Sequence, residues 1–138
     1  MTAILKTLEE KFSDEARFNK KLSNFSWLNT GGEADIFFKP NDIKQLAEFV
    51  KLIKHDYKKF ITLGAGSNTL ISDKIFDGAV VKLGKNFSNI SILPNGVIVA
   101  GSACTDKKLS NFALENGIGS FEFLACIPGT VGGGLKMN

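Results

Sequence analysis

The sequence predicts an α+β domain in which a small α/β unit is followed by an antiparallel sheet. Apolar residues recur at helical spacing in some segments, short runs rich in β-branched residues lie between them, and turn residues separate the runs. The predicted helices cover 3–12, 43–53 and 106–116, and the predicted strands cover 34–40, 59–63, 78–84, 89–93 and 96–101.

The first half of the chain predicts helix, strand, helix and strand in that order. In the first segment Ile4, Leu5, Leu8 and Phe12 share one helical face. A polar stretch over 13–32 is expected to be irregular, and Pro40 ends the strand that follows it.

Capping and turn residues mark the elements that come next. Asn41 is the expected N-cap of the second helix, whose apolar face is Ile43, Leu46, Ala47, Val50 and Ile53. In the second half, the residues Pro94-Asn95-Gly96 predict a hairpin turn. The helix after the hairpin places Leu109, Phe112 and Ala113 on one face and ends at Asn116-Gly117.

Composition supports a folded domain and argues against several function classes. The chain has 138 residues, of which 43% are hydrophobic, and its net charge is +3. Arg17 is the only arginine and the lysines are dispersed, so a nucleic-acid-binding face is not expected. The N-terminus is not a signal peptide and no apolar run has membrane-spanning length. These features predict a cytoplasmic protein without nucleic-acid or membrane partners, and they carry no signal for an oligomeric state.

The cysteines and the histidine show no metal-binding spacing. Cys104 and Cys126 lie in apolar surroundings without a CxxC motif, which predicts buried free thiols in a reducing compartment and no metal site. A reactive thiol at Cys126 is the alternative, because this cysteine borders a glycine-rich segment. His55 lies in the charged "KHDYKK" segment, 54–59, and is interpreted as solvated.

The stretch "FITLGAGSNTLI", 60–71, runs from a strand into glycines. Glycines allow a ligand to approach the main chain, and successive N–H groups can then converge on an anion such as a pyrophosphate. Ser67 and Asn68 add side-chain donors, and "TLIS", 69–72, is expected to continue as a strand. The loop is neither a P-loop nor a GxGxxG fingerprint opening a helix. A tight turn between two strands is the alternative.

A second glycine-rich stretch, "FLACIPGTVGGGLKMN", closes the sequence at 123–138. The apolar run before it predicts a loop held against the core, close to something flat or charged, with the hydroxyl of Thr130 among the glycines. A surface linker is the alternative. We expect the two glycine segments to hold one ligand from two sides.

These motifs together resemble a known family. "NTGG" (29–32), "LGAGSNTLI" (63–71), "AGS" (100–102) and "EFLACIPGTVGGGLKMN" (122–138) stand in order. The sequence resembles the N-terminal part of the UDP-N-acetylenolpyruvoylglucosamine reductase family, also called UDP-N-acetylmuramate dehydrogenases. These are bacterial peptidoglycan-precursor enzymes of the vanillyl-alcohol-oxidase-like FAD class.

The resemblance implies a fold, a cofactor and a set of binding residues. The implied fold is a two-subdomain FAD-binding domain over 29–138, truncated before the substrate domain and preceded by an N-terminal helical segment over 1–28. Gly134 stands where the family commonly has Ala or Ser. The implied contacts to non-covalent FAD are Leu63, Gly64, Ala65, Gly66, Ser67, Asn68, Thr69, Ile127, Pro128, Gly129, Thr130, Gly132, Gly133, Met137 and Asn138.

The resemblance also implies an activity. In the family NADPH reduces the flavin, which passes a hydride to the enolpyruvyl group of a UDP-sugar. The family's catalytic arginine, serine and glutamate lie beyond Asn138, so no residue here is assigned a catalytic role. The alternatives are an inactive remnant, a stand-alone flavin-binding module, or a related flavin oxidase. An isolated chain of this length is expected to bind FAD poorly and to aggregate.

Overall fold

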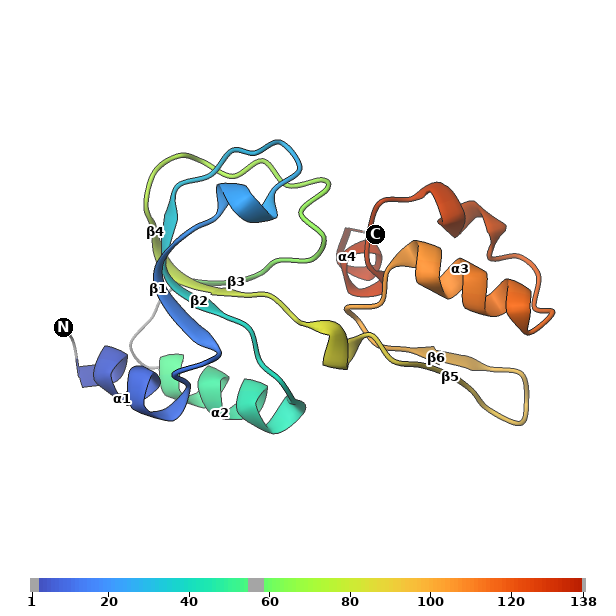
Figure 1. Cartoon of the computed structure of the whole chain (residues 1–138), viewed down its shortest axis with the longest axis horizontal. Coiled ribbons are helices and arrows are strands. Elements are labelled where there is room, and N and C mark those ends of the chain that lie inside the picture. Colours follow the sequence, from blue (N-terminus) through green and yellow to red (C-terminus); the bar gives the residue numbers. More distant parts are fainter. Residues whose placement is uncertain (1–2, 55–58, 138) are drawn as a thin grey trace.

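The computed structural model describes residues 3–54 and 59–137, which form two lobes joined by one strand-to-helix connection (Figure 1). The first lobe holds α1 to β4, and the second holds β5 to α4. The elements in chain order are α1 (Ala3–Lys11), β1 (Ala16–Lys21), η1 (Ser23–Phe25), β2 (Glu33–Phe38), α2 (Ile43–Ile53), β3 (Phe60–Thr62), β4 (Phe76–Val81), η2 (Lys85–Phe87), β5 (Ile90–Ile92), β6 (Ile98–Ala100), α3 (Asp106–Glu115), η3 (Glu122–Cys126) and α4 (Val131–Met137), where η denotes a 3₁₀ helix.

The first lobe is built on a mixed sheet with the strand order β1-β2-β4-β3. β1 and β2 are antiparallel, whereas β2 and β3 both run parallel to β4. The parallel pairing of β3 and β4 places Thr62 opposite Val81. Because both strands end there, the chain segments that follow them start side by side at one edge of the sheet.

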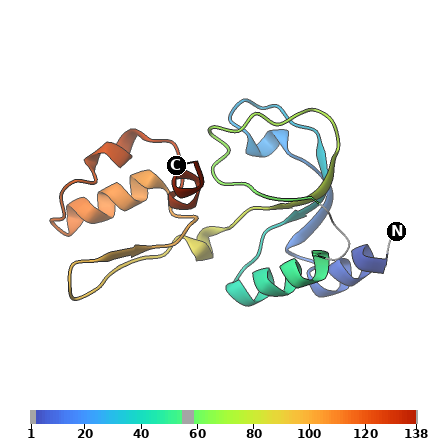
Figure 2. The same cartoon turned by 180° about the vertical axis from the view of Figure 1, so that it is seen from behind.

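Each face of this sheet has its own core. α1 and α2 cover one face, where the ring of Phe38 stacks on Phe49 with centroids 3.8 Å apart and meets Phe12 edge-on at 5.1 Å. The opposite face carries Phe37 and Leu63, which pack with Leu22, Ala34 and Val80. No helix longer than one 3₁₀ turn covers this second face in the described residues. The loops over 23–32 and 63–75 lie there instead (Figures 1 and 2).

The second lobe consists of a β5–β6 hairpin, α3, η3 and α4. The chain crosses into this lobe near η2, where Gly101 lies so close to Phe87 that an added Cβ would be 2.1 Å from the Phe87 carbonyl oxygen. An isolated bridge between Thr105 and Thr130 joins the start of α3 to the start of α4. This bridge ties the last segment of the chain to the body of the lobe.

Most predicted elements are confirmed, and so is the α+β class. The helices over 3–12, 43–53 and 106–116 are present, and the predicted strands overlap β2 to β6. The hairpin turn at Pro94-Asn95-Gly96 joins β5 to β6, with Gly96 at φ +79°. Gly117 ends α3 with φ +67°, as its type and position predict.

The stretch over 13–32, which the sequence predicts to be irregular, contains β1 and η1, so that prediction is wrong. β1 is an edge strand with an alternating exposed pattern, and of its residues only Ala16 and Phe18 contact the core, which leaves little apolar signal in the sequence. The core runs across the domain boundary expected at residue 28, because Leu8 and Phe12 pack in the same cluster as Ile36.

Two details of α2 also differ from the prediction. The N-cap is Asp42, whose side chain accepts a hydrogen bond from the Gln45 N–H at 2.8 Å, and not Asn41. The Gln45 side chain in turn accepts a hydrogen bond from the Asn41 N–H, which resembles a capping box. Ile43 is 67% exposed, and the buried face is centred on Phe49, because the sheet packs against the C-terminal half of this helix.

Two carboxyl groups lie on neighbouring strands of the first lobe. Asp35 in β2 and Asp77 in β4 interact, and the pKa of Asp35 is raised, first by burial and then by its hydrogen bond to Asp77 and repulsion from it. A raised pKa means that the folded state holds the proton more tightly than the unfolded state. Ionised Asp35 therefore lowers the stability of the fold at neutral pH.

We predict that Asp35→Asn raises the free energy of unfolding at pH 7 relative to the original chain and has a smaller effect at pH 3. The loss of stability caused by Asp35 begins as the pH rises through the ordinary aspartate pKa. It is complete above the raised pKa of Asp35 in the folded state. Urea unfolding at both pH values measures the difference. Asp77→Asn is the matched control and should give a smaller effect of the same sign, because burial of Asp35 remains. Equal effects of Asp35→Asn at the two pH values would contradict this assignment.

Candidate cofactor-binding site

The first glycine loop, which we define as residues 64–69, begins where β3 ends. Leu63 anchors its start, with a buried side chain in the second-face core and an N–H that donates to the Val81 carbonyl at 2.8 Å. The loop does not continue as a strand at 69–72, so that prediction is wrong: no strand is assigned between β3 and β4. The main chain is instead bent and exposes its polar groups.

Three of the six carbonyl oxygens of this loop accept hydrogen bonds from other parts of the protein. The Gly66 carbonyl accepts from the Trp27 N–H at 3.0 Å, and the Thr69 carbonyl accepts from the Ser26 hydroxyl at 3.1 Å. The Gly64 carbonyl accepts from the Lys82 ammonium group. Gly66 lies at φ +73°, and a Cβ there would be 1.9 Å from the Phe25 carbonyl oxygen, so only glycine fits. The segment 23–28 therefore serves as a brace for the loop.

The N–H groups of the same loop are arranged in the opposite way. Within the described residues, no N–H of 64–69 donates a hydrogen bond to another protein group. The side chains of Ser67 and Asn68 likewise make no hydrogen bond to a described residue. A run of main-chain donors with carbonyls fixed behind them matches the anion-binding concavities made by successive backbone N–H groups.

The second glycine segment differs from the loop that the sequence predicts. Residues 131–137 form α4, with Thr130 directly before it, so the predicted glycine loop is a short helix. The Thr130 hydroxyl accepts from the Gly133 N–H at 3.2 Å. The Val131 and Gly132 N–H groups donate to the carbonyls of Cys104 and Ser102, each at 2.9 Å. Glycine disfavours a helix by about 1 kcal/mol per residue, so these tertiary bonds stabilise α4.

Gly132 shows why glycine is needed in this helix. A Cβ there would lie 2.8 Å from the Ser102 Cβ and 2.9 Å from the Ser102 carbonyl oxygen. Gly129 is similarly close to another element, because its added Cβ would lie 2.4 Å from a carboxylate oxygen of Asp106. Asp106 is buried in the first turn of α3, and burial raises the pKa of its carboxyl group. The glycines thus let the chain pack against "AGS" and the start of α3.

The structure brings the two glycine segments together. A Cβ added to Gly64 would lie 3.0 Å from the Thr130 hydroxyl and 4.0 Å from the Gly133 Cα. α4 accordingly faces the loops of the first lobe in both views (Figures 1 and 2). Gly64, Thr130 and Gly133 therefore border the same space, which is the position that a Cβ on residue 64 would occupy and crowd.

The other predicted contacts are distributed unevenly around this space. Ala65 and Ser67 are half-buried and Asn68 is exposed in the first loop, whereas Leu63 offers only its carbonyl, since its side chain and N–H are engaged. Ile127 and Met137 are exposed at 44% and 71%. Pro128 is exposed and Gly129 half-buried. Asn138 and His55 lie outside the described residues.

The apolar run before Pro128 is not buried as its composition suggests. Residues 122–126 form η3, and Phe123 is 67% exposed. Cys126 is exposed, so the prediction of a buried thiol is wrong for this residue, whereas Cys104 is buried and its thiol pKa is raised mainly by burial. Both cysteines are free. A run of apolar residues cannot by itself distinguish a buried strand from an exposed 3₁₀ turn.

Sequence reasoning misses two contributors to the site. The brace at 23–28 falls in the stretch expected to be irregular, and its Ser26 and Trp27 have no motif of their own. Lys82 follows a buried strand and gives no signal, because a lone lysine after a strand is ordinary. The register of β3 against β4 identifies Lys82, since Thr62 pairs with Val81. "NTGG" also packs against the segment that follows the loop, where the Gly32 N–H donates to the Ser72 carbonyl at 2.9 Å.

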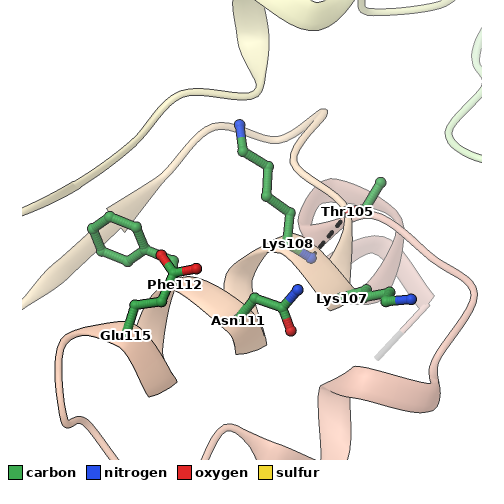
Figure 3. A pocket seen from close by; sticks show the side chains of 6 residues that line it. All are labelled: Thr105, Lys107, Lys108, Asn111, Phe112 and Glu115. Atoms are coloured by element: carbon green, nitrogen blue, oxygen red, sulfur yellow. Dashed lines mark hydrogen bonds between the residues drawn. The ribbon is translucent and has the colours of Figure 1, made fainter.

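A shallow hollow elsewhere does not belong to this space. It has a volume of about 420 Å³ and is lined by one face of α3, including Lys107, Asn111 and Phe112 (Figure 3). Thr105 at its end caps α3 through the Lys108 N–H at 3.2 Å. Neither glycine segment contributes to its lining, so we do not assign it to the site.

In the described part of the chain, no group of three or more His, Cys, Asp or Glu side chains is placed to hold a metal ion. The helices there are all too short or too polar to cross a membrane.

Comparison with known proteins places this geometry in a family. A family model described as "FAD binding domain" matches residues 34–138. The chain is 59% identical over 134 residues to UDP-N-acetylenolpyruvoylglucosamine reductase of Pelagibacter ubique, covering 97% of this chain and 44% of that protein. It is 46% identical over 125 residues to the protein of the same name from Rickettsia bellii, covering 90% and 41%.

A solved structure shows the same fold. The crystal structure of UDP-N-acetylenolpyruvylglucosamine reductase from Thermus caldophilus matches with a TM-score of 0.70 and 25% identity, over 90% of this chain and 41% of that one. The chain thus spans less than half the length of the relatives it matches. Because the family model matches 34–138, which includes β3, β4 and both glycine segments, this chain belongs to the FAD binding domain family.

Proposed function

We propose that this chain forms the FAD-binding part of a reductase that converts UDP-N-acetylenolpyruvoylglucosamine to UDP-N-acetylmuramate in peptidoglycan precursor synthesis. The observation that carries the proposal is the first glycine loop, whose N–H groups have no acceptor among the described residues while three of its six carbonyls accept hydrogen bonds from other segments. The names of the relatives supply the substrate and the reaction.

The residues present fit a flavin dinucleotide. The diphosphate of FAD carries negative charge, and the N–H groups of 64–69 are donors that suit it. Gly64 and Gly133 leave open the space that a Cβ would fill, with the Thr130 hydroxyl at its border. In this arrangement Gly64 to Thr69 would hold the diphosphate, and Thr130 and Gly133 would line the cofactor from the second lobe.

The rest of the activity is proposed from the relatives. When bound, the flavin supplies hydride transfer, with NADPH as the source of the hydride, and this chain's own groups bind and orient the cofactor. No residue of this chain is assigned a catalytic role. FAD is expected to be non-covalent. The reaction uses nucleotide sugars and NADPH, so we place the protein in the cytoplasm, with a small-molecule substrate and without nucleic-acid or membrane partners.

Exposed apolar side chains flank the proposed site. Trp27 and Leu28 on the brace, Leu70 after the first loop, and Leu135 and Met137 on α4 are all more than half exposed. Such a concentration of large apolar residues is unusual for a monomer surface and favours self-association. It supports the expectation that the chain, alone, binds FAD weakly and aggregates.

We predict that a chimera in which residues 1–138 replace the aligned segment of the Pelagibacter ubique reductase carries FAD in a 1:1 ratio and oxidises NADPH only when the enolpyruvyl sugar nucleotide is present. The chain alone is expected to bind FAD weakly and to show no turnover. Flavin absorbance after gel filtration measures the cofactor, and NADPH absorbance measures turnover.

The parental Pelagibacter enzyme is the control for assay conditions, and circular dichroism of the chimera checks that it folds. A folded chimera without flavin would contradict FAD binding by this chain. A chimera with flavin but no substrate-dependent turnover would leave a flavin-binding module as the function. Stoichiometric FAD on the chain alone would contradict the expected weak binding.

We predict that Gly64→Ala weakens FAD binding roughly tenfold or more, because the added methyl would narrow the space beside Thr130 and Gly133. Gly134→Ala is the matched control, since a Cβ there meets no atom within 4 Å and alanine favours a helix. Titration of each variant with FAD, followed by flavin fluorescence, gives the dissociation constants. Equal affinities for the two variants would show that Gly64 does not border the cofactor.

A further inference from the structure

Three carbonyl oxygens of the first glycine loop accept hydrogen bonds from an N–H, a hydroxyl and an ammonium group. Of these donors only Lys82 carries a formal charge, and it bonds the Gly64 carbonyl at the start of the loop. The peptide between Gly64 and Ala65 thus has its oxygen bound to a cation. Its N–H, on Ala65, has no acceptor among the residues that the structure describes.

The main chain around Lys82 is fixed from both sides. The Lys82 N–H donates to the Phe38 carbonyl at 3.0 Å, and the Val81 carbonyl accepts from the Leu63 N–H at 2.8 Å. Lys82 therefore directly follows β4, a strand that is hydrogen-bonded to β2 on one side and to β3 on the other. Its side chain reaches the loop that follows β3, so the lysine connects the sheet directly to the glycine loop.

The surroundings of Lys82 leave its charge uncompensated. The residue is half-buried, and within the described ranges no carboxylate forms an ion pair with it. Lys39 is the nearby charged group that acts on it: burial lowers the pKa of Lys82 first, and repulsion from Lys39 lowers it further. A half-buried cation beside a second cation is unfavourable unless an anion is also present.

We propose that Lys82 is a positioning residue for the diphosphate of the cofactor: its ammonium group holds the Gly64 peptide so that the loop N–H groups stay available, and its charge offsets that of the diphosphate. This inference rests on the proposed function. A cation on a carbonyl oxygen also polarises the peptide, which makes the attached N–H a stronger donor. Lys82 thereby acts through the Ala65 N–H and by its charge.

The test uses the chimera with the Pelagibacter ubique reductase, because the chain alone is expected to aggregate. Chimeras labelled with ¹⁵N-alanine report the Ala65 amide in the original chain sequence and in Lys82→Met, Lys82→Arg and Lys39→Met. FAD and inorganic pyrophosphate are titrated separately. Lys82→Met is expected to shift the free Ala65 amide and to weaken binding of both probes roughly tenfold to a hundredfold.

Lys82→Arg keeps the charge and should retain most of the affinity. Lys39→Met is the matched control, because it removes a neighbouring positive charge without removing the bond to Gly64, and it should change affinity at pH 7 less than about threefold. The chimera with the original chain sequence should lose affinity as the pH rises toward the lysine range. Lys39→Met should move that loss to higher pH, because repulsion on Lys82 is relieved.

The outcomes separate this proposal from the proposed function. An unchanged Ala65 amide and unchanged pyrophosphate affinity in Lys82→Met would overturn the role of Lys82, whether or not FAD binds. Pyrophosphate binding that depends on Lys82, together with no FAD binding by any variant, would support Lys82 and contradict the proposed cofactor. Equal losses of affinity in Lys39→Met and Lys82→Met would show that Lys82 contributes only its positive charge, and they would overturn its positioning role.

Discussion

The pairing of β3 with β4 is the constraint on which the rest of the site depends. This register sets Thr62 against Val81 and lets the Leu63 N–H bond the Val81 carbonyl. It also buries Leu63 in the core beneath the loops. Leu63, the residue before the glycine loop, is therefore held by a strand and a core, while no N–H group of the loop itself donates to a described residue. An exposed main chain keeps the N–H donors of a binding loop available to a ligand. A rigid start lowers the entropy cost of ordering the loop when the ligand binds.

The first glycine loop gathers groups that are distant in sequence. Ser26 and Trp27 come from the segment after β1, Lys82 follows β4, and each bonds a different carbonyl of the loop. Their combined effect is to orient the peptide units, because a carbonyl held on one side leaves its N–H on the other. Glycine at 66 permits this at φ +73°, where the Phe25 carbonyl occupies the place of a Cβ. The anion-binding character of the loop thus comes from its neighbours as much as from its own glycines.

The sequence predicts the parts of this arrangement that depend on local chemistry. The hairpin at Asn95-Gly96, the stop at Gly117 and the helix over 43–53 follow from turn and periodicity rules, and both glycine segments are recognisable as places of close approach. The parts it misses depend on tertiary contacts. β1 is an edge strand with few buried residues, so its pattern is weak. α4 contains consecutive glycines and forms because Ser102, Cys104 and Thr130 accept its first N–H groups, which no local propensity could show.

Because the second glycine segment is helical, the two segments offer different kinds of contact to a ligand. The first N–H groups of α4 are already bonded within the protein, so this segment offers few main-chain donors to a ligand. What it contributes is surface without side chains: Gly133 and the Thr130 hydroxyl approach Gly64 closely enough that a methyl group would contact them. In the proposed site the first segment therefore supplies charge recognition and the second supplies shape. A flavin dinucleotide, which has a charged diphosphate and a flat ring system, requires both kinds of surface, whereas a simple anion would require only the first.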